Sequence, residues 1–219
     1  MKVDAVSKTY RDDARETHVL RAANLELRHG ETTSLTGVSG SGKSTLVSLL
    51  AGLLVPDSGR VLFDGQDTTD LDDIARAELR ANRIGVVLQS GNLIPFLTAV
   101  ENVKLAIELA GGARAGARAK ELLSELGLAD RLDHLPRRMS GGEVQRVSVA
   151  VALANEPDLL LADEVTGELD SATADQVIGV IFDAWREREL TVLFVTHSGE
   201  LAERAQTRLR LAEGQVTRA

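Results

Sequence analysis

The order of apolar and polar residues divides the chain into an alternating first part, a helical middle and an alternating last part. Alternation with a period of two, which is typical of strands, is found at residues 3–6, 19–27, 32–36 and 60–65. A continuous apolar run at residues 84–88 predicts a buried parallel strand. Between these strands, residues 46–51 are expected to begin a helix.

The middle of the chain, from about residue 89 to residue 155, has a helical pattern. Apolar residues recur at helical spacing at residues 99–109 and 117–126, and Gly127 suits a helix C-cap. Strand character returns at residues 159–162 and 191–195, on either side of an amphipathic stretch at residues 172–189. We therefore predict an α/β core, residues 1–88 and 158–219, interrupted by a helical subdomain at residues 89–157.

A glycine-rich motif follows the strand at residues 32–36 and precedes the helix at residues 46–51. It reads G-x-x-x-x-G-K-S, the phosphate-binding P-loop, in the strand–loop–helix context that the motif requires. Its glycines let backbone amides curl around a phosphate, and the following helix adds its positive dipole end. Lys43 can reach the β- and γ-phosphates, and the Ser44 hydroxyl can ligate Mg²⁺. The predicted nucleotide-binding residues here are Gly37, Ser39, Gly40, Ser41, Gly42, Lys43, Ser44 and Thr45.

Composition narrows the class of protein further. Acidic residues outnumber basic ones, 33 against 25, so the formal net charge is −8, which argues against a general nucleic-acid-binding protein. Cysteine is absent, which excludes disulfides, thiolate metal sites and cysteine nucleophiles. The first residues lack the apolar segment of a signal peptide, and no apolar run is long enough to span a bilayer. We therefore expect another chain to provide the anchor if the protein works at a membrane.

A second motif, which is acidic, follows the apolar strand at residues 159–162. In P-loop proteins such a strand lies beside the P-loop strand, so its last residues reach the Mg²⁺ and the γ-phosphate. We expect Asp163 to hold the metal and Glu164 to accept a proton from the attacking water. A buried strand that runs into an acidic loop is common, and the independent P-loop upstream favours the functional interpretation.

Ser140, Gly141, Gly142 and Glu143 precede a helical stretch at residues 144–155. A serine followed three residues later by a glutamate forms a capping box, which explains part of the pattern. The two glycines are not needed for capping, and they expose amides that make a second anion site. The two sites serve one nucleotide if they converge, either within one chain or between two copies.

In this order, the P-loop, Gln89, Ser140–Glu143, Asp163–Glu164, Asp170 and His197 resemble the ATP-binding-cassette (ABC) ATPases of transporters. Three segments are most similar in sequence to the lipoprotein-releasing and macrolide-export group, namely residues 97–103, 140–146 and 161–167. The resemblance covers nearly the whole chain. It implies a P-loop NTPase core with a mostly parallel sheet flanked by helices, an N-terminal antiparallel β subdomain and an inserted α-helical subdomain.

The resemblance also implies roles for individual residues. Two copies pair head to tail, and each ATP lies between one copy's P-loop and the Ser140–Gly142 helix end of the other. Tyr10 stacks on adenine, Gln89 touches Mg²⁺ and the attacking water, and His197 contacts the γ-phosphate. Asp170 belongs to a loop that crosses the dimer interface. Without the resemblance, Tyr10, Gln89 and His197 would be ordinary residues at the ends of strands.

Several positions depart from the family pattern, namely Leu88, Val151, Val165, Glu168 and Ser198. None of them removes a group that would hold phosphate or magnesium or act as the base. They do bear on loop geometry and dimer contacts, so we expect hydrolysis to be slow or to depend on the partner. Residues 93–97 form an apolar loop that either lines a groove for a permease or packs the helical subdomain.

We therefore predict the ATP-hydrolysing subunit of a membrane ABC transporter, with ATP and Mg²⁺ as cofactors. Its expected partners are a second copy and an integral membrane permease, without nucleic acid, and its expected place is the cytoplasmic face of the cell membrane. Two alternatives remain. One is a regulatory ABC ATPase that signals through a membrane partner, and the other is a DNA-repair or chromosome-organising ATPase. The second is disfavoured because such proteins carry a long coiled coil between the P-loop and the acidic strand.

Overall fold

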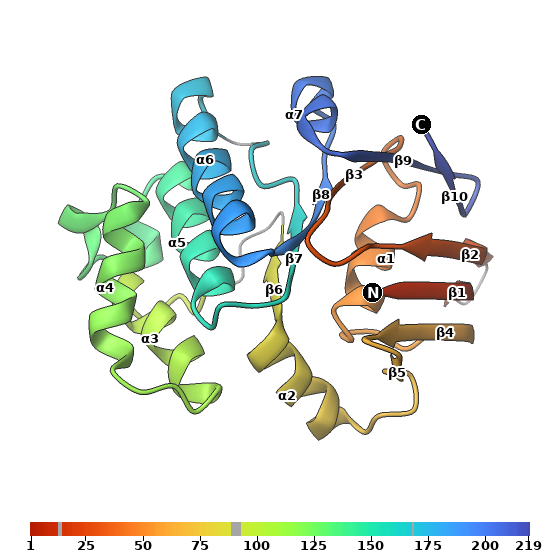
Figure 1. Cartoon of the computed structure of the whole chain (residues 1–219), viewed down its shortest axis with the longest axis horizontal. Helices are drawn as coiled ribbons and strands as arrows, with labels where there is room; N and C mark the ends of the chain where they lie inside the picture. The colour runs from red at the N-terminus through yellow and green to blue at the C-terminus, as the bar shows by residue number, and fades with distance from the viewer. Residues whose placement is uncertain (13–14, 89–92, 168) are drawn as a thin grey trace. The chain divides into compact units, whose positions relative to one another are not determined.

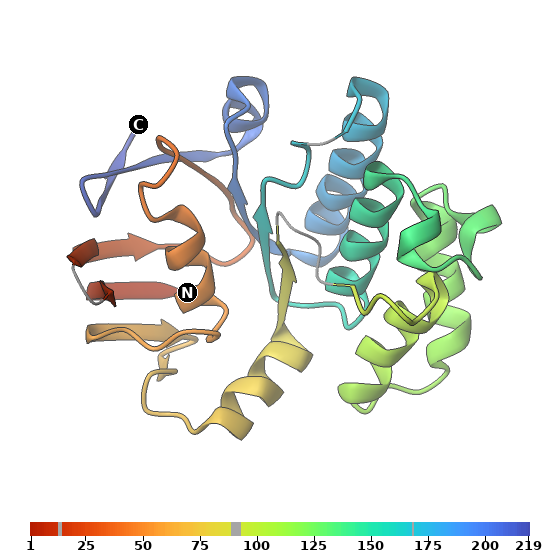
Figure 2. The ribbon, with the colours of Figure 1, turned by 180° about the vertical axis from the view of Figure 1, so that it is seen from behind.

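The computed structural model describes residues 1–12, 15–88, 93–167 and 169–219 (Figure 1, Figure 2). The chain forms two compact units, Met1–Arg80 with Thr191–Ala219 and Ala81–Leu190. The first unit is called unit 1 below and the second unit 2. The strands at residues 84–88 and 159–162 fall in unit 2 with the helices, whereas the sequence analysis assigned them to the core. The core and subdomain boundaries drawn from the sequence stay a prediction.

Unit 1 contains most of the strands of the molecule. Its elements are β1 (Lys2–Asp12), β2 (Arg15–Glu26), β3 (Thr32–Thr36), α1 (Lys43–Leu50), β4 (Ser58–Phe63), β5 (Gln66–Asp67), α2 (Asp73–Arg83, which ends in unit 2), β8 (Thr191–Val195), α7 (Gly199–Arg204), β9 (Thr207–Ala212) and β10 (Gln215–Arg218). The strands form two groups that differ in direction. Two antiparallel pairs, β4 with β5 and β9 with β10, are joined by connections of only two residues, as such pairs allow.

The first group is an antiparallel sheet in the order β2-β1-β4-β5. Val3 pairs with Leu25 on one side and with Val61 on the other, and all three side chains are buried. β4 turns back into β5 through Asp64 and Gly65, which both have positive φ angles. This confirms the predicted hairpin strand at residues 60–65 and the predicted N-terminal antiparallel region.

The second group is built around β3, which runs parallel to both β8 and β9. β10 then pairs with β9 in the antiparallel direction. Leu35, Phe194 and Val195 are almost completely buried, as expected for strands that are covered on both faces. Because parallel strands end at the same edge, the P-loop after β3 and the residues after β8 leave the sheet on the same side.

Unit 2 contains most of the helices. Its elements are β6 (Ile84–Val87), α3 (Ala99–Leu109), α4 (Ala115–Glu125), the short 3₁₀ helices η1 (Ala129–Arg131) and η2 (Pro136–Arg138), α5 (Gly141–Leu153), β7 (Leu159–Asp163) and α6 (Ser171–Arg188). Figure 1 shows α3 and α4 in green beside α5, and these three helices contact one another. The predicted helices at residues 99–109 and 117–126 are therefore confirmed, the second with a shift of two residues at its start.

β6, which pairs in parallel with β7, packs closely against α5. A Cβ atom at Gly85 would lie 2.3 Å from the carbonyl oxygen of Ala152, so only glycine allows this approach of helix to strand. β7 is buried along its whole length, from Leu159 to Asp163. The packing fixes where β7 ends, and therefore where Asp163 and Glu164 emerge. Within the described ranges, no helix has both the length and the apolar character needed to cross a bilayer.

Candidate nucleotide-binding site

The P-loop joins β3 to α1 in unit 1, as the sequence predicted. Gly42 precedes the helix with a φ of 102°, a conformation that side chains disfavour. A Cβ atom there would lie 2.6 Å from Cγ1 of Val19 on β2. Glycine is therefore required at this position both for its backbone angle and for the close approach of β2.

The polar groups of the loop converge on the start of α1. Lys43 is 7% exposed, and its ammonium donates hydrogen bonds to the carbonyl oxygens of Gly37 at 2.9 Å and Val38 at 3.2 Å. The Ser41 hydroxyl oxygen is buried and has no hydrogen-bond partner among the described residues. No described side chain caps α1, so its first amides are left for another acceptor.

These features suit a bound phosphate, because the loop offers a cation, a buried hydroxyl and uncapped amides at a helix N-terminus. Ser44 is the second residue of α1 and is exposed, so its hydroxyl is accessible to Mg²⁺. Ser39 and Gly40 are exposed on the outside of the loop, and Thr45 is half-buried. The residues present therefore fit a nucleoside phosphate with Mg²⁺.

Two further residues named by the resemblance lie in unit 1. Tyr10, near the end of β1, is 44% exposed, and its hydroxyl lies 3.5 Å from the Thr45 hydroxyl on α1. His197 is exposed and follows β8, which pairs with β3 so that Val195 lies beside Leu35. The amide of Thr196 donates to the carbonyl of Leu35 at 3.2 Å and extends this pairing. Tyr10 thus lies beside the helix of the P-loop, and His197 leaves the sheet at the same edge as the loop.

The acidic pair lies at the end of β7 in unit 2. Asp163 is 3% exposed, whereas Glu164 is half-buried and has a φ of 53°. The carbonyl of Glu164 accepts a hydrogen bond from the amide of Gly167 at 3.0 Å, which closes a turn directly after the strand. The two neighbouring carboxylates therefore differ in their surroundings: Asp163 is buried in the sheet, and Glu164 lies in a turn.

The second helix end, at Ser140, is organised in a different way. The Ser140 hydroxyl accepts a hydrogen bond from the Glu143 amide at 3.2 Å, and the Glu143 carboxylate accepts one from the Ser140 amide at 2.8 Å. The other carboxylate oxygen of Glu143 accepts from Nε of Arg131 at 2.8 Å. The Ser140 amide and then Arg131 hold the pKa of Glu143 below its ordinary value.

The start of α5 lies against the start of α6. A Cβ atom on Gly142 would be 3.1 Å from Cδ2 of Leu169, so this glycine keeps the two segments close. Asp170 caps α6, and its carboxylate accepts hydrogen bonds from the hydroxyl of Thr173 at 2.7 Å and from its amide at 3.0 Å. These bonds, the hydroxyl's first, hold the pKa of Asp170 below its ordinary value.

The structure thus groups the predicted residues into two sets. Unit 1 holds Tyr10, the P-loop and His197, and unit 2 holds Ser140–Gly142, Asp163, Glu164 and Asp170. Gln89 and Glu168 lie outside the described residues. Among the departures, Val165 is buried and Ser198 caps α7 by accepting from the Leu201 amide at 3.3 Å.

Sequence reasoning missed two groups of residues that brace the site. Arg131 holds Glu143, and Asp57 holds the segment of β1 that leads to Tyr10. The capping box is a local signal that reveals Glu143, but its partner Arg131 is 12 residues away, at the end of the 3₁₀ helix η1. Asp57 contacts residues 48 and 49 positions away, and no local pattern indicates such a contact.

Fold and site together define the class of protein: a P-loop nucleotide-binding protein of the α/β class. The family model of the ABC transporter matches residues 20–167, and the chain belongs to this family. It is an ATP-binding cassette, and its activity is that of an ATPase with ATP and Mg²⁺ as cofactors. The predicted fold class, family and enzymatic activity are confirmed.

Known proteins with high similarity come from the group that the sequence indicated. The lipoprotein-releasing system ATP-binding protein LolD of Maricaulis maris is 48% identical, over 99% of this chain and 96% of its own length. The macrolide export ATP-binding/permease protein MacB of Syntrophobacter fumaroxidans is 41% identical, over 99% of this chain and 31% of its own length. The dimeric, post-hydrolysis structure of the ATP-binding cassette MJ0796 with ADP and Pi is 38% identical and has a TM-score of 0.95. It aligns over 99% of this chain and 96% of its own.

Proposed function

We propose that this chain hydrolyses ATP as a head-to-tail dimer and thereby drives a separate membrane permease for export or extraction of a substrate. The observation that carries the proposal is the start of α1, where a buried lysine and a buried hydroxyl meet helix amides that no described side chain caps. Relatives named for lipoprotein release and macrolide export support transport rather than signalling alone.

The P-loop residues bind and neutralise the phosphates. Lys43 exchanges its bonds to the Gly37 and Val38 carbonyls for the β- and γ-phosphates, and the amides from Ser39 to Thr45 surround the β-phosphate. Ser44 and Asp163 would hold Mg²⁺, with Gln89 as a further ligand. The metal ion, when bound, offsets negative charge on the phosphates. Tyr10 stacks on the adenine ring.

The acidic residue after Asp163 activates water. Glu164 accepts the proton of the attacking water, whose oxygen bonds to the γ-phosphorus as the bond to the β–γ bridging oxygen breaks and ADP leaves. Gln89 and His197 orient the water and the phosphate. Asp163 is buried at the end of β7, so the strand fixes the position of its carboxylate. The turn at residues 164–167 sets the direction of the Glu164 side chain relative to the strand.

The second helix end completes the site from the other copy. Ser140 and the amides of Gly141 and Gly142 contact the γ-phosphate held by the P-loop of the partner subunit. Asp170, which caps α6 beside Gly142, lies in the dimer interface. The dimeric cassette structure with ADP and Pi supports this arrangement.

The permease docks on the helical part of the chain, which places the protein on the cytoplasmic face of the membrane. Phe96 is 77% exposed in the loop before α3. The buried Asn102 holds this loop by hydrogen bonds to the amide of Ile94 and to the carbonyls of Ile94 and Leu97. A loop that is held firmly while it exposes a large apolar side chain suits a protein partner.

Steady-state ATP turnover of a Glu164→Gln variant tests the catalytic assignment. Turnover should fall by about 10²- to 10⁴-fold, the usual contribution of a general base, while ATP binding is retained. Glu189→Gln is the matched control, because Glu189 is also a glutamate with a left-handed backbone, φ 54° against 53°. Turnover of the Glu164→Gln variant close to that of the wild type would refute the assignment.

Membrane association tests the partner assignment. In cells that produce the chain, the wild type should sediment with the membrane fraction and Phe96→Ser should shift to the supernatant. Leu109→Ser is the control, because Leu109 is 72% exposed on the same unit. Equal membrane association of the two variants would contradict docking at Phe96.

A further inference from the structure

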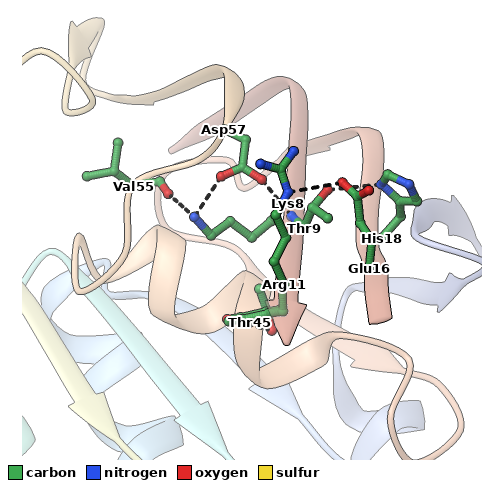
Figure 3. Close-up of polar contacts among 9 residues, drawn as sticks. Lys8, Thr9, Arg11, Glu16, His18, Thr45, Val55 and Asp57 are labelled. Atoms are coloured by element: carbon green, nitrogen blue, oxygen red, sulfur yellow. Dashed lines mark hydrogen bonds and ion pairs between the residues drawn. The ribbon is translucent and has the colours of Figure 1, made fainter. Parts of the chain in front are cut away.

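A cluster of polar contacts among Lys8, Val55 and Asp57 and the Thr9 amide fixes the strand segment that carries Tyr10 (Figure 3). β1 pairs with β4 from Lys2 to Ser7, and Ser58 is the first residue of β4. Beyond this point, the contacts of β1 on this side come from the loop between α1 and β4. The segment that leads to Tyr10 therefore depends on a loop rather than on a neighbouring strand.

Asp57 in this loop continues the sheet pairing with both its backbone and its side chain. Its amide donates to the Ser7 carbonyl at 2.9 Å, and its carboxylate accepts from the Thr9 amide at 2.6 Å. The second bond takes the place of a strand–strand hydrogen bond, because β4 begins only at Ser58 and cannot pair with Thr9. The carboxylate thus holds the backbone one residue before Tyr10.

Lys8 closes the same cluster from the strand side. Its ammonium donates to the Asp57 carboxylate and to the Val55 carbonyl, each at 2.9 Å. The Lys8 side chain is only 17% exposed, whereas that of Asp57 is 45% exposed, so water reaches the pair from the aspartate side. Lys8 and then the Thr9 amide hold the pKa of Asp57 below its ordinary value, so Asp57 is ionised at neutral pH.

The other side of the segment is held by β2 and by α1. The hydroxyl of Thr9 lies 3.0 Å from Nδ1 of His18, across the β1–β2 pair. The Tyr10 hydroxyl lies 3.5 Å from the hydroxyl of Thr45 in the first turn of α1. Val55 and Asp57 follow the other end of that helix. The segment is therefore tied to α1 at the start of the helix and to the loop after its end.

We propose that Asp57 is a positioning residue for the base of the nucleotide, because its carboxylate holds Lys8 and the Thr9 amide and so fixes the strand that presents Tyr10. The inference rests on the proposed role of Tyr10 in stacking on adenine. A half-exposed aromatic ring at the end of a hairpin loses conformational freedom when it stacks on a base. Because the cluster already fixes the backbone of this segment, less conformational entropy is lost when the ring stacks on the base. The cluster therefore favours binding of the adenosine group without contacting the phosphates.

The test compares two ligands that differ only in the adenosine group, Mg·ADP and Mg·pyrophosphate, by isothermal titration calorimetry with the full chain. Tyr10→Ala should raise the Kd for ADP about fivefold or more, the usual effect of losing a base–aromatic stack. Asp57→Ala should raise it about three- to tenfold and leave the Kd for pyrophosphate unchanged within about twofold. In the Tyr10→Ala background, Asp57→Ala should cause no further change, because the ring that it positions is gone.

Asp4→Ala is the matched control, because Asp4 also lies on β1 and forms a 2.9 Å ion pair, with Arg60 on β4. Its Kd for ADP should equal that of the wild type. If Asp57→Ala does not fold, Lys8→Met tests the same cluster from the other partner, because it removes the ion pair with Asp57 and should likewise raise the Kd for ADP but not for pyrophosphate. An equal loss of ADP and pyrophosphate binding, or an equal loss in the Tyr10→Ala background, would overturn the positioning role. A wild-type chain that bound neither ligand would overturn the proposed function itself.

Discussion

The two helix ends proposed to meet the γ-phosphate, those of α1 and α5, differ in how their first amides are satisfied. α1 follows a glycine in the left-handed conformation, and no described side chain caps it. α5 follows Ser140 in an extended conformation, and a reciprocal capping box with Glu143 closes its first turn. The first amides of α1 are left for a ligand, whereas α5 already uses the Glu143 amide and leaves those of Gly141 and Gly142 without an intrahelical partner.

Because of this difference, we expect the two helix ends to have different roles, one in nucleotide affinity and one in turnover. The α1 end depends on phosphate to satisfy its groups, so it should dominate nucleotide affinity. The α5 end is stable without a ligand, and Arg131 braces it from behind through Glu143. We therefore expect α5 to add little to binding by a single chain and to act on turnover in the dimer.

Loss of the lysine at the α1 end should have the largest effect. Lys43→Ala removes the charge that binds the phosphates, so ATP affinity should fall strongly and turnover should fall by about 10²-fold or more. Calorimetry and steady-state ATPase assays measure the two quantities. Lys104→Ala is the control, because Lys104 is an exposed partner of Glu108 on α3. Similar affinities of the wild type and Lys43→Ala would contradict the assigned dominance of the α1 end.

A negative charge at the start of α5 should distinguish the two roles of Ser140, which are helix capping and phosphate binding. Aspartate caps helices about as well as serine, so Ser140→Asp should change the free energy of unfolding by less than about 0.5 kcal/mol. Its carboxylate repels phosphate, so turnover should fall by about tenfold or more while ATP binding to a single chain persists. Thr98→Asp makes the same change in the capping box of α3 and should leave turnover intact. Equal turnover of the two variants would mean that the α5 end does not meet phosphate.

Removal of the brace behind the α5 end should have a smaller effect. Arg131→Met leaves the capping box in place but frees the Glu143 carboxylate on one side, so turnover should fall about two- to fivefold without loss of ATP affinity. Arg83→Met is matched in exposure, 41% against 43%, and removes an ion pair with Asp158 in the same unit. If both variants lost turnover equally, the effect would reflect general destabilisation of unit 2.

The smallest expected effect concerns the stability of the α5 end at acid pH. Because the pKa of Glu143 is lowered in the folded chain, its ionised form adds stability above the unfolded pKa of about 4.3. That stability is lost as the pH falls through the lower folded value. Glu143→Gln keeps an acceptor for the Ser140 amide, so it should cost about 0.5 kcal/mol at pH 7. The difference from the wild type should shrink as the pH falls below about 4.3 and vanish once the pH is below the folded pKa, which urea titrations at a series of pH values would show. A difference that stayed constant down to pH 2 would contradict this.

How far the sequence predicted the molecule depended on the range of the contacts involved. The P-loop, the capping box at Ser140 and the acidic end of β7 are local patterns, and the structure has each where the sequence placed it. α2 was missed because it is a polar surface helix with no buried residue, which leaves no apolar stripe to recognise. β9 and β10 were missed although residues 208–211 alternate in polarity.

The contacts that brace the site were beyond sequence reasoning for a physical reason. The bond from Arg131 to Glu143 requires two short 3₁₀ helices to fold back toward α5. The bond from the Thr9 amide to Asp57 requires β4 to begin only at Ser58, so that a side chain in the preceding loop pairs with β1 in place of the strand. Such partners follow from tertiary geometry, and neither residue type nor spacing indicates them.

The central claim is that the two helix ends of different copies share one nucleotide, and mixing two inactive variants tests it most directly. Lys43→Ala lacks a working α1 end and Ser140→Asp lacks a working α5 end, so each alone should show little ATP turnover. In an equal mixture, random pairing makes half of the dimers mixed, each with one complete site, so turnover should recover to about a quarter of the wild-type value. A mixture that remained as inactive as its separate components would contradict the shared site.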